Sequence, residues 1–152
     1  MFSTARYFIK TSIAFLVVGL LTGLHMTLAT NVFKKGYGAE LISAHTHVIL
    51  VGSVIMMIMG VALWFFPRPE KTDTHYNPTN ILIAYWIMTI ATSLRYVFQV
   101  SAAYAEADWV KVMIAAASTL QIIAIIYFFY AMWGRIRASG GSLIREQKGE
   151  KF

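Results

Sequence analysis

Four apolar runs, each long enough to cross a membrane, constrain the fold of this 152-residue chain more than any other feature of its sequence. The runs cover residues 7–33, 41–66, 80–100 and 109–133. A helix of roughly 20 apolar residues crosses the hydrocarbon core of a bilayer, whereas a barrel strand is shorter and alternates apolar with polar residues. Because no water in that core can satisfy free backbone groups, each run is expected to be a helix. The sequence therefore predicts an all-α integral membrane four-helix bundle.

The composition narrows the class of protein further. Hydrophobic residues make up 58% of the chain and charged residues 13%, against roughly 25% charged residues in soluble domains. The absence of cysteine excludes disulfides, thiolate metal ligands and covalent attachment of haem. The net charge of +6 predicts no nucleic-acid partner, because the basic residues stand at the ends of the apolar runs rather than together on a soluble face.

The basic residues also predict the orientation of the helices. One side of the membrane receives only Lys34, Lys35 and Lys111 near the spans, and all the other basic residues near span ends fall on the opposite side. By the positive-inside rule, both termini are expected in the cytoplasm of a multi-pass protein of a prokaryotic cytoplasmic (inner) membrane. Residues 1–134 are expected to form the four-helix domain and residues 135–152 a polar cytoplasmic tail. The first run is too long for a signal peptide. The basic residues assigned to the cytoplasmic side are Arg6, Lys10, Arg68, Lys71, Arg135, Arg137, Arg145, Lys148 and Lys151.

Three of the four histidines fall inside the predicted spans, where an imidazole is costly and therefore indicates function. His25 lies near the end of the first run, and His45 and His47 lie near the start of the second. The antiparallel hairpin formed by these two runs is expected to bring all three to a similar depth near the outer face. His75 falls in the loop between the second and third runs and is interpreted as a solvated residue.

His45 and His47 are expected to point about 200° apart, since successive residues of an α-helix turn by about 100°. From one straight helix they cannot bind one ion together. Each can supply an axial nitrogen to a separate haem, or one can bind a cofactor and the other a neighbouring subunit. The alternative is that these histidines only form hydrogen bonds between helices. A slot for the macrocycle could be opened by Gly23, Gly52, Ser53 and Gly60 and lined by Tyr96, Phe98, Tyr104 and Trp109.

Other polar and aromatic residues support this interpretation or have structural explanations. Arg95, within the third run, is expected either to pair with a haem propionate or to extend to the membrane interface. Lys34, Lys35 and Lys111 are interpreted mainly as surface anchors, and Gln99, Glu106 and Asp108 as outer-surface residues. Core packing is expected for Met56, Met57 and Met59. An aromatic belt at the inner ends is expected from Tyr85, Trp86, Tyr127, Tyr130 and Trp133.

The second run also resembles a known family. Ala44-His45-Thr46-His47-Val48-Ile49-Leu50, followed by Ile58-Met59-Gly60 and Trp64-Phe65-Phe66-Pro67, is similar to the tenth transmembrane helix of subunit I of the haem–copper oxidases, a family that includes the nitric oxide reductases. The resemblance implies that His45 ligates a high-spin haem and His47 a low-spin haem, whereas His25 matches no haem ligand of the family. The copper-ligating His-His pair and the His–Tyr element of the family are absent from this sequence, so no binuclear haem–copper centre is expected.

The resemblance also carries an expectation about assembly. The catalytic subunit of the family has twelve spans in three related arcs of four, and this chain looks like one arc. A homo-oligomer is therefore implied, with a homotrimer favoured, in which each haem lies between His45 of one protomer and His47 of the next. A competing geometry places a haem inside one protomer between His25 and His47, and leaves His45 for a second haem, a metal or a hydrogen bond.

Together these features predict a membrane cytochrome that binds non-covalent haem b near the outer face. It would be an electron-transfer or oxidoreductase protein working between a quinol or periplasmic donor and a partner protein, or would bind NO or O₂ if one haem is five-coordinate. Two alternatives stay open: a protein that handles copper or haem, with His25, His45 and His47 as copper ligands, and a non-catalytic accessory subunit of a respiratory complex. No Gly-rich phosphate loop or nucleophile–base pair supports a hydrolase.

Overall fold

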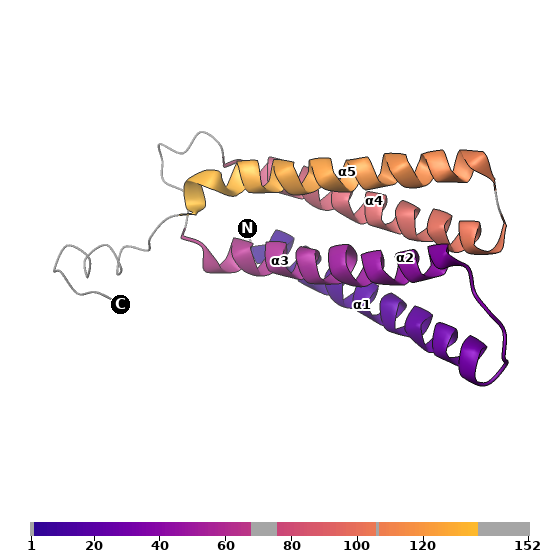
Figure 1. Cartoon of the computed structure of the whole chain (residues 1–152). Coiled ribbons are helices and arrows are strands. Elements are labelled where there is room, and N and C mark those ends of the chain that lie inside the picture. The colour runs from indigo at the N-terminus through magenta and orange to yellow at the C-terminus, as the bar shows by residue number, and fades with distance from the viewer. Residues whose placement is uncertain (1, 68–75, 106, 137–152) are drawn as a thin grey trace, which may run out of the picture.

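The structure is a computed structural model that describes residues 2–67, 76–105 and 107–136 (Figure 1). All regular elements in these ranges are helical, as predicted. α1 covers Phe2–Asn31. The second span joins three elements end to end: α2 (Ala39–His47), the π-helix η1 (Val48–Ile55) and α3 (Met56–Phe65). α4 covers Pro78–Tyr104, α5 covers Asp108–Met132, and the short 3₁₀-helix η2 (Trp133–Arg135) follows.

The four predicted spans are confirmed as helical segments that are long and apolar enough to cross a membrane, namely Ser3–Asn31, Ala39–Phe65, Pro78–Tyr104 and Asp108–Arg135. Prolines set the ends of two of them, as local backbone chemistry requires. Phe66 is already extended before Pro67, and Pro78 stands in the first turn of α4. The Asn77 side chain caps α4 by accepting a 2.9 Å hydrogen bond from the backbone N–H of Thr79.

The helices pack as two pairs that contact each other at both ends of the bundle. α4 lies along α5, and α1 lies along α3 and η1 (Figure 1). We call the end that holds the start of α1 and the end of α5 the terminal end, and the end that holds the connection 32–38 the loop end. Toward the loop end, α1 diverges from α2, while α2 packs against α4.

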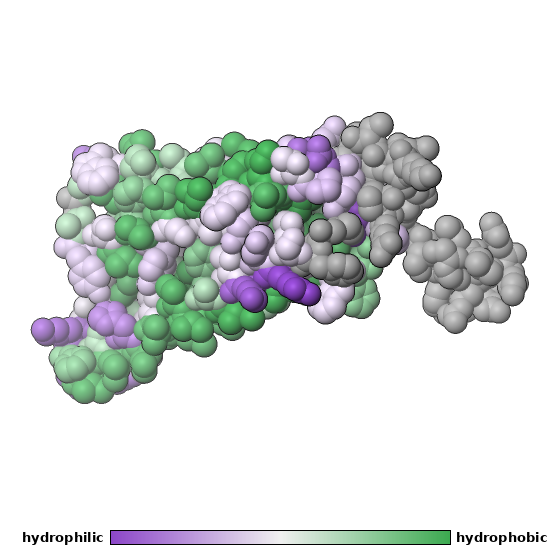
Figure 2. All heavy atoms as spheres, turned by 180° about the vertical axis from the view of Figure 1, so that it is seen from behind, coloured by the Kyte–Doolittle hydropathy of each residue, from purple (hydrophilic) through white to green (hydrophobic). Residues whose placement is uncertain are grey.

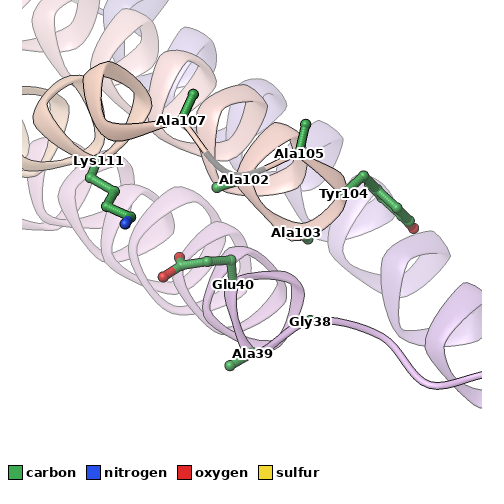
Figure 3. A pocket seen from close by; sticks show the side chains of 9 residues that line it. All are labelled: Gly38, Ala39, Glu40, Ala102, Ala103, Tyr104, Ala105, Ala107 and Lys111. Atoms are coloured by element: carbon green, nitrogen blue, oxygen red, sulfur yellow. The ribbon is translucent and has the colours of Figure 1, made fainter.

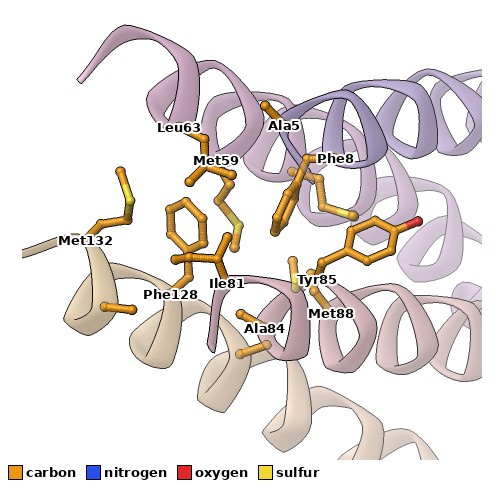
Figure 4. Packing of buried hydrophobic residues seen from close by; sticks show 13 residues of the cluster. Ala5, Phe8, Met59, Leu63, Ile81, Ala84, Tyr85, Met88, Phe128 and Met132 are labelled. Atoms are coloured by element: carbon orange, nitrogen blue, oxygen red, sulfur yellow. The ribbon is translucent and has the colours of Figure 1, made fainter. Parts of the chain in front are cut away.

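The hydrophobic core lies at the terminal end, where α1, α3, α4 and α5 meet (Figure 4). Met56, Met59 and Met88 are fully buried in it, which confirms the core role predicted for the first two. The polarizable, unbranched methionine side chain fills irregular gaps between helices. The buried residues of this apolar cluster are Ala5, Phe8, Met56, Met59, Leu63, Ile81, Ala84, Tyr85, Met88, Ala124, Phe128, Ala131 and Met132.

Tyr85 belongs to this core and not to an aromatic belt. Its ring packs edge-on against Phe8 with centroids 5.2 Å apart, and its hydroxyl lies 2.9 Å from the hydroxyl of Thr11. By contrast, Trp86, Tyr130 and Trp133 are exposed, as residues of a belt would be. The flank of the bundle seen from behind is mostly apolar (Figure 2), in keeping with a surface that faces lipid.

Glycines let α1 approach the second span closely. A Cβ added at Gly60 would lie 2.9 Å from side-chain atoms of Phe8 and Ile9 of α1, and one at Gly52 would lie 3.1 Å from Phe15 of α1 and 2.9 Å from Thr92 of α4. Helix contacts therefore fill the space at these two glycines, so the expectation that they open a cofactor slot is wrong. Small residues allow close helix packing in membranes, where lipid provides no hydrophobic force between helices.

Arg135 is buried at the terminal end, although the sequence placed it at the start of a polar tail. Its guanidinium donates hydrogen bonds to the backbone carbonyls of Leu63, Phe66 and Pro67 at 2.8–3.0 Å and lies 5.0 Å from the ring centre of Tyr76. A cation at a helix C-terminus satisfies carbonyls that have no partner inside the helix. The four-helix unit therefore includes Arg135. Residues 137–152 of the proposed tail, His75 in its loop, and Glu106 lie outside the described residues.

Candidate functional site

His45 lies between α2 and α1 and is half-buried. Its Nδ1 lies 2.9 Å from the backbone carbonyl oxygen of Gly19 on α1. The ring packs over Gly23, where an added Cβ would come within 2.9 Å of Cε1 of His45. Because Gly23 has no side chain, α1 leaves room for an imidazole at this position. Gly23 is thus the one predicted slot glycine that accommodates a candidate ligand.

His47 is also half-buried and is oriented by its own helix. Its Nδ1 lies 2.8 Å from the backbone carbonyl oxygen of Ser43 and 3.3 Å from the hydroxyl of the same residue. His47 is the last residue of α2, and the π-helix η1 begins at the next residue. π-Helical segments are rare in proteins, and those that occur often lie at functional sites. Such a segment also changes the angular positions of the residues that follow it.

The two hydrogen bonds fix the same tautomer in both histidines. A carbonyl oxygen can only accept, so Nδ1 of His45 and Nδ1 of His47 each carry the proton and donate it. The Nε2 atom of each ring then has a free lone pair. Metal-ligating histidines characteristically donate their other ring N–H to a carbonyl or carboxylate in this way, which fixes the ring and raises its basicity as a ligand.

His25 occupies a different place from the other two. It is exposed, and its Nε2 lies 2.9 Å from the hydroxyl of Tyr104 at the end of α4. It lines a groove of about 380 Å³ that also includes Leu41 and Tyr96 but neither His45 nor His47. His45 lines a separate groove of about 560 Å³, with Gly23 and other residues of α1. The structure does not bring His25 and His45 to one groove.

His25 and His45 lie at neighbouring levels along α1. The ring of His45 lies at Gly19 and Gly23, and His25 follows Gly23 by two residues, which corresponds to about 3 Å along a helix. The prediction of a similar depth for the three histidines stays a prediction.

Arg95 lies inside the bundle and does not extend to the interface. It is half-buried, and its Nη1 donates a 2.8 Å hydrogen bond to Oε1 of Gln121 on α5. The Nε2 of Gln121 donates in turn to the hydroxyl of Thr92 at 2.9 Å. Nε of Arg95 is buried and has no hydrogen-bond partner among the described residues. The guanidinium thus retains an unused donor.

Two further polar residues join α2 to α4, and sequence reasoning missed their role. Gln99, expected at the outer surface, is only 1% exposed, and its Nε2 donates a 2.7 Å hydrogen bond to the hydroxyl of Ser43. Ser43 in turn accepts the hydrogen bond from Nδ1 of His47, so Gln99 supports the orientation of that histidine indirectly, through Ser43. The sequence could have indicated the contact between Ser43 and His47, because Ser43 stands one helical turn before His47.

The remaining predicted site residues are distributed over the loop end. Tyr96 and Tyr104 line the groove of His25, and the hydroxyl of Tyr96 lies 2.7 Å from that of Thr22. Phe98 packs edge-on against Trp109 at 6.1 Å between ring centres. Lys34 and Lys35 are exposed. Lys111 lies 3.2 Å from Asp108 in an exposed ion pair, which contributes little to stability.

The described residues contain no group of three or more His, Asp or Glu side chains placed to hold a metal ion. A planar macrocycle needs only one or two axial nitrogens, which His45 and His47 could supply. Comparisons of the chain with protein-family models, with curated proteins and with solved structures find no match. The four spans and the apolar flank define the chain as an all-helical, multi-pass membrane protein.

Proposed function

We propose that this protein is a membrane cytochrome that binds non-covalent haem b through Nε2 of His45 and Nε2 of His47. The observation that carries the proposal is the pair of Nδ1–H···O=C hydrogen bonds, which leaves both Nε2 atoms free to ligate. The sequence resemblance of residues 44–67 to the His-x-His helix of the haem–copper oxidases points to the same two residues.

The two ligands serve different faces of the second span. His45 faces α1, whereas His47 follows Ser43 on the face that contacts α4. Opposed ligands of this kind can bridge neighbouring copies around a closed ring. We therefore infer a homotrimer in which each haem takes His45 from one protomer and His47 from the next. Arg95 is the candidate partner for a propionate, since its Nε is unused and a guanidinium binds carboxylates with two parallel hydrogen bonds.

A bound haem b supplies one-electron transfer, and a five-coordinate one also binds NO or O₂. The chain contributes the axial nitrogens, their fixed tautomer and the burial that tunes the potential. The charge distribution of the sequence favours a prokaryotic cytoplasmic membrane with both termini inside and the haem near the outer face. At that depth, a quinol or a periplasmic protein is the candidate electron donor.

The proposal is tested by absorption spectra of the detergent-purified protein after expression with haem supplied, first oxidised and then reduced with dithionite. We expect a Soret band and sharp reduced α and β bands in the wild type and in His25→Ala. We expect His45→Ala and His47→Ala each to lose the sharp bands, because each haem needs both residues. A folded wild type without a Soret band would refute the cytochrome, and bound copper in that sample would favour copper handling instead.

The shared-haem arrangement makes a separate prediction about mixtures. Co-expressing His45→Ala with His47→Ala chains should restore sharp haem bands that neither variant shows alone. In a randomly mixed ring, about one quarter of the interfaces would join an intact His45 to an intact His47. The check is the reduced α band of the co-purified oligomer, compared with a mixture of the two proteins purified apart. No recovery on co-expression would exclude sharing between protomers and leave a site within one chain.

A further inference from the structure

Polar residues repeat along the faces by which α2 and α4 contact each other near the loop end. Glu40, Ser43 and His47 follow one another at helical spacing on α2, and Arg95 and Gln99 do so on α4. We call these five residues the polar strip. Hydrocarbon cannot satisfy such groups, and each would be expensive to expose to lipid.

One hydrogen bond sets the register between the two halves of the strip. Ser43 lies opposite Gln99, with 2.7 Å between the hydroxyl and Nε2. Because α2 and α4 run in opposite directions, Glu40 lies toward the loop end, and His47 comes to the level of Arg95 one turn deeper. The strip therefore runs from the loop end to His47 without an apolar interruption.

Three buried side-chain polar atoms of α4 have no hydrogen-bond partner among the described residues. Among the described residues, the buried side-chain oxygen and nitrogen atoms without a hydrogen bond are Oγ1 of Thr89, Nε of Arg95 and Oε1 of Gln99. Nε of Arg95 and Oε1 of Gln99 belong to the polar strip, whereas Thr89 lies about one turn beyond Thr92 toward the terminal end. Buried polar groups are normally paired, and those that find no protein partner are commonly satisfied by internal water. The two unpaired atoms of the strip therefore indicate bound water beside it.

The loop end of the strip opens into a pocket of about 490 Å³ (Figure 3). Glu40 from α2 and Lys111 from α5 extend toward each other across it, and the wall opposite α2 is made of alanines near the end of α4. The small alanine side chains leave the space open, and the two charged groups keep it wet. This pocket is large enough to hold several water molecules.

The other end of the strip is closed. Just below Arg95, the buried hydrogen bond between Gln121 and Thr92 joins α5 to α4. Below that bond, Met88 and Met56 of the apolar cluster are fully buried. Apart from the isolated hydroxyl of Thr89, the side chains of this apolar plug offer water no hydrogen-bond partners, and one hydroxyl cannot hold a chain of water molecules. The terminal end of the bundle therefore gives no polar route to His47 in the described residues.

We propose that the polar strip is a binding site for a chain of water molecules that enters through the Glu40–Lys111 pocket and ends at His47 and Arg95. Water then reaches the His47 face of the second span from the loop end only. This inference goes beyond the haem assignment, because it holds whether or not His47 binds a cofactor. It fixes the side of the membrane from which hydrophilic solutes reach that histidine.

The absence of cysteine makes the native chain a ready background for thiol labelling. We would introduce Ser43→Cys and His47→Cys on the strip, Ile42→Cys on the side of α2 that faces away from it, Met88→Cys in the plug, and Lys35→Cys as a marker of the loop end. The probe is a membrane-impermeant anionic methanethiosulfonate, added to haem-free protein in sealed vesicles of known orientation. Size-exclusion profiles confirm folding, and two strip variants guard against the loss of one.

We expect Ser43→Cys and His47→Cys to react from the same side as Lys35→Cys, at least about tenfold faster than Ile42→Cys, because thiol reactivity follows access to water. Ile42 is the matched control, since it is more exposed than Ser43 in the protein alone but lies about 140° round the helix from His47. Equal rates at positions 42 and 43, no reaction at either strip position, or reaction from the terminal end would overturn the proposal. Repeating the labelling of Ser43→Cys, which keeps His47, with haem loaded separates the two hypotheses: a rate that haem leaves unchanged would count against ligation at His47 and leave the water chain standing.

Discussion

Replacing Arg135 with alanine is expected to lower the free energy of unfolding by about 3 kcal/mol or more, since hydrogen bonds to charged groups contribute about 1.5–3 kcal/mol each and buried carbonyls left without a partner add a cost. The guanidinium is completely buried and donates to the carbonyls of Leu63, Phe66 and Pro67, where the second span ends. No other described side chain reaches these oxygens. The measurement is the unfolding midpoint in a denaturing-detergent titration.

Arg6→Ala is the matched control for this substitution. Arg6 lies at the same end of the bundle but is exposed, so its loss should change the unfolding midpoint little. Arg135→Lys should fall between the two, because an ammonium retains the charge but cannot spread donors over three carbonyls. A midpoint for Arg135→Ala equal to that of Arg6→Ala would show that these contacts do not hold α5 to the second span.

Because Arg135 is buried against backbone carbonyls, it no longer counts as a free positive charge when the orientation in the membrane is predicted. Sequence patterning treats every lysine and arginine near a span end as a cytoplasmic marker. Arg135 instead serves the end of a helix, a role that a hydropathy pattern cannot distinguish. Arg6 and Lys10 at the start of α1 remain exposed charges at the terminal end, opposite Lys34 and Lys35. The charge asymmetry behind the predicted orientation therefore survives the reassignment of Arg135.

The spans were predictable from sequence because the physics that sets them is local. An apolar run of sufficient length has no structure other than a helix available in hydrocarbon, and Pro67 and Pro78 fix boundaries through their own backbone restrictions. The opposed directions of His45 and His47 also follow from helical periodicity alone. The partners that fix their tautomers do not: the Gly19 carbonyl depends on how closely α1 packs against α2.

The interior position of Gln99 was missed because the end of the third span was placed too early. With the span ending at residue 100, Gln99 stands at the surface. α4 continues to Tyr104, and the residue becomes 1% exposed between helices. Ser101 and Tyr104 are polar and acidic residues follow them, so hydropathy alone ends the run about one turn too early. With the helix extended to Tyr104, the amide of Gln99 lies between helices and donates a hydrogen bond to Ser43.

The π-helix η1 has no signature that sequence reasoning could detect. Val48–Ile55 is an apolar segment with the composition of an ordinary membrane helix. Within η1, Gly52 packs against Thr92 of α4 and Ile49 packs against Gly19 of α1. The π-helix therefore coincides with close contacts to two other helices. Its position directly after His47 separates the angular phase of the two histidines from that of α3. An uninterrupted α-helix drawn from His45 and His47 into α3 would therefore assign the residues of α3 to the wrong faces.

Replacing Gly23 with leucine is expected to weaken haem binding by about 10–100-fold, which is the usual cost of disturbing a group that orients a metal ligand. The Cβ alone would lie 2.9 Å from Cε1 of His45, and the longer side chain would occupy the position of the ring. The imidazole must then turn away and lose its hydrogen bond to the Gly19 carbonyl. Haem titration of the purified protein, followed at the Soret band, measures the effect.

Gly36→Leu is the matched control for Gly23→Leu, because an added Cβ at Gly36 meets nothing within 4 Å. A readout independent of haem comes from nitrogen NMR of the histidine rings. We expect Nδ1 of His45 to be protonated in the native protein and in Gly36→Leu, and the Nδ1–H signal to shift in Gly23→Leu, while the Nδ1–H of His47 remains. If Gly23→Leu displaces the His45 ring but binds haem as tightly as the native protein, His45 is not the ligand, and the axial nitrogen on this side of the second span must come from another residue.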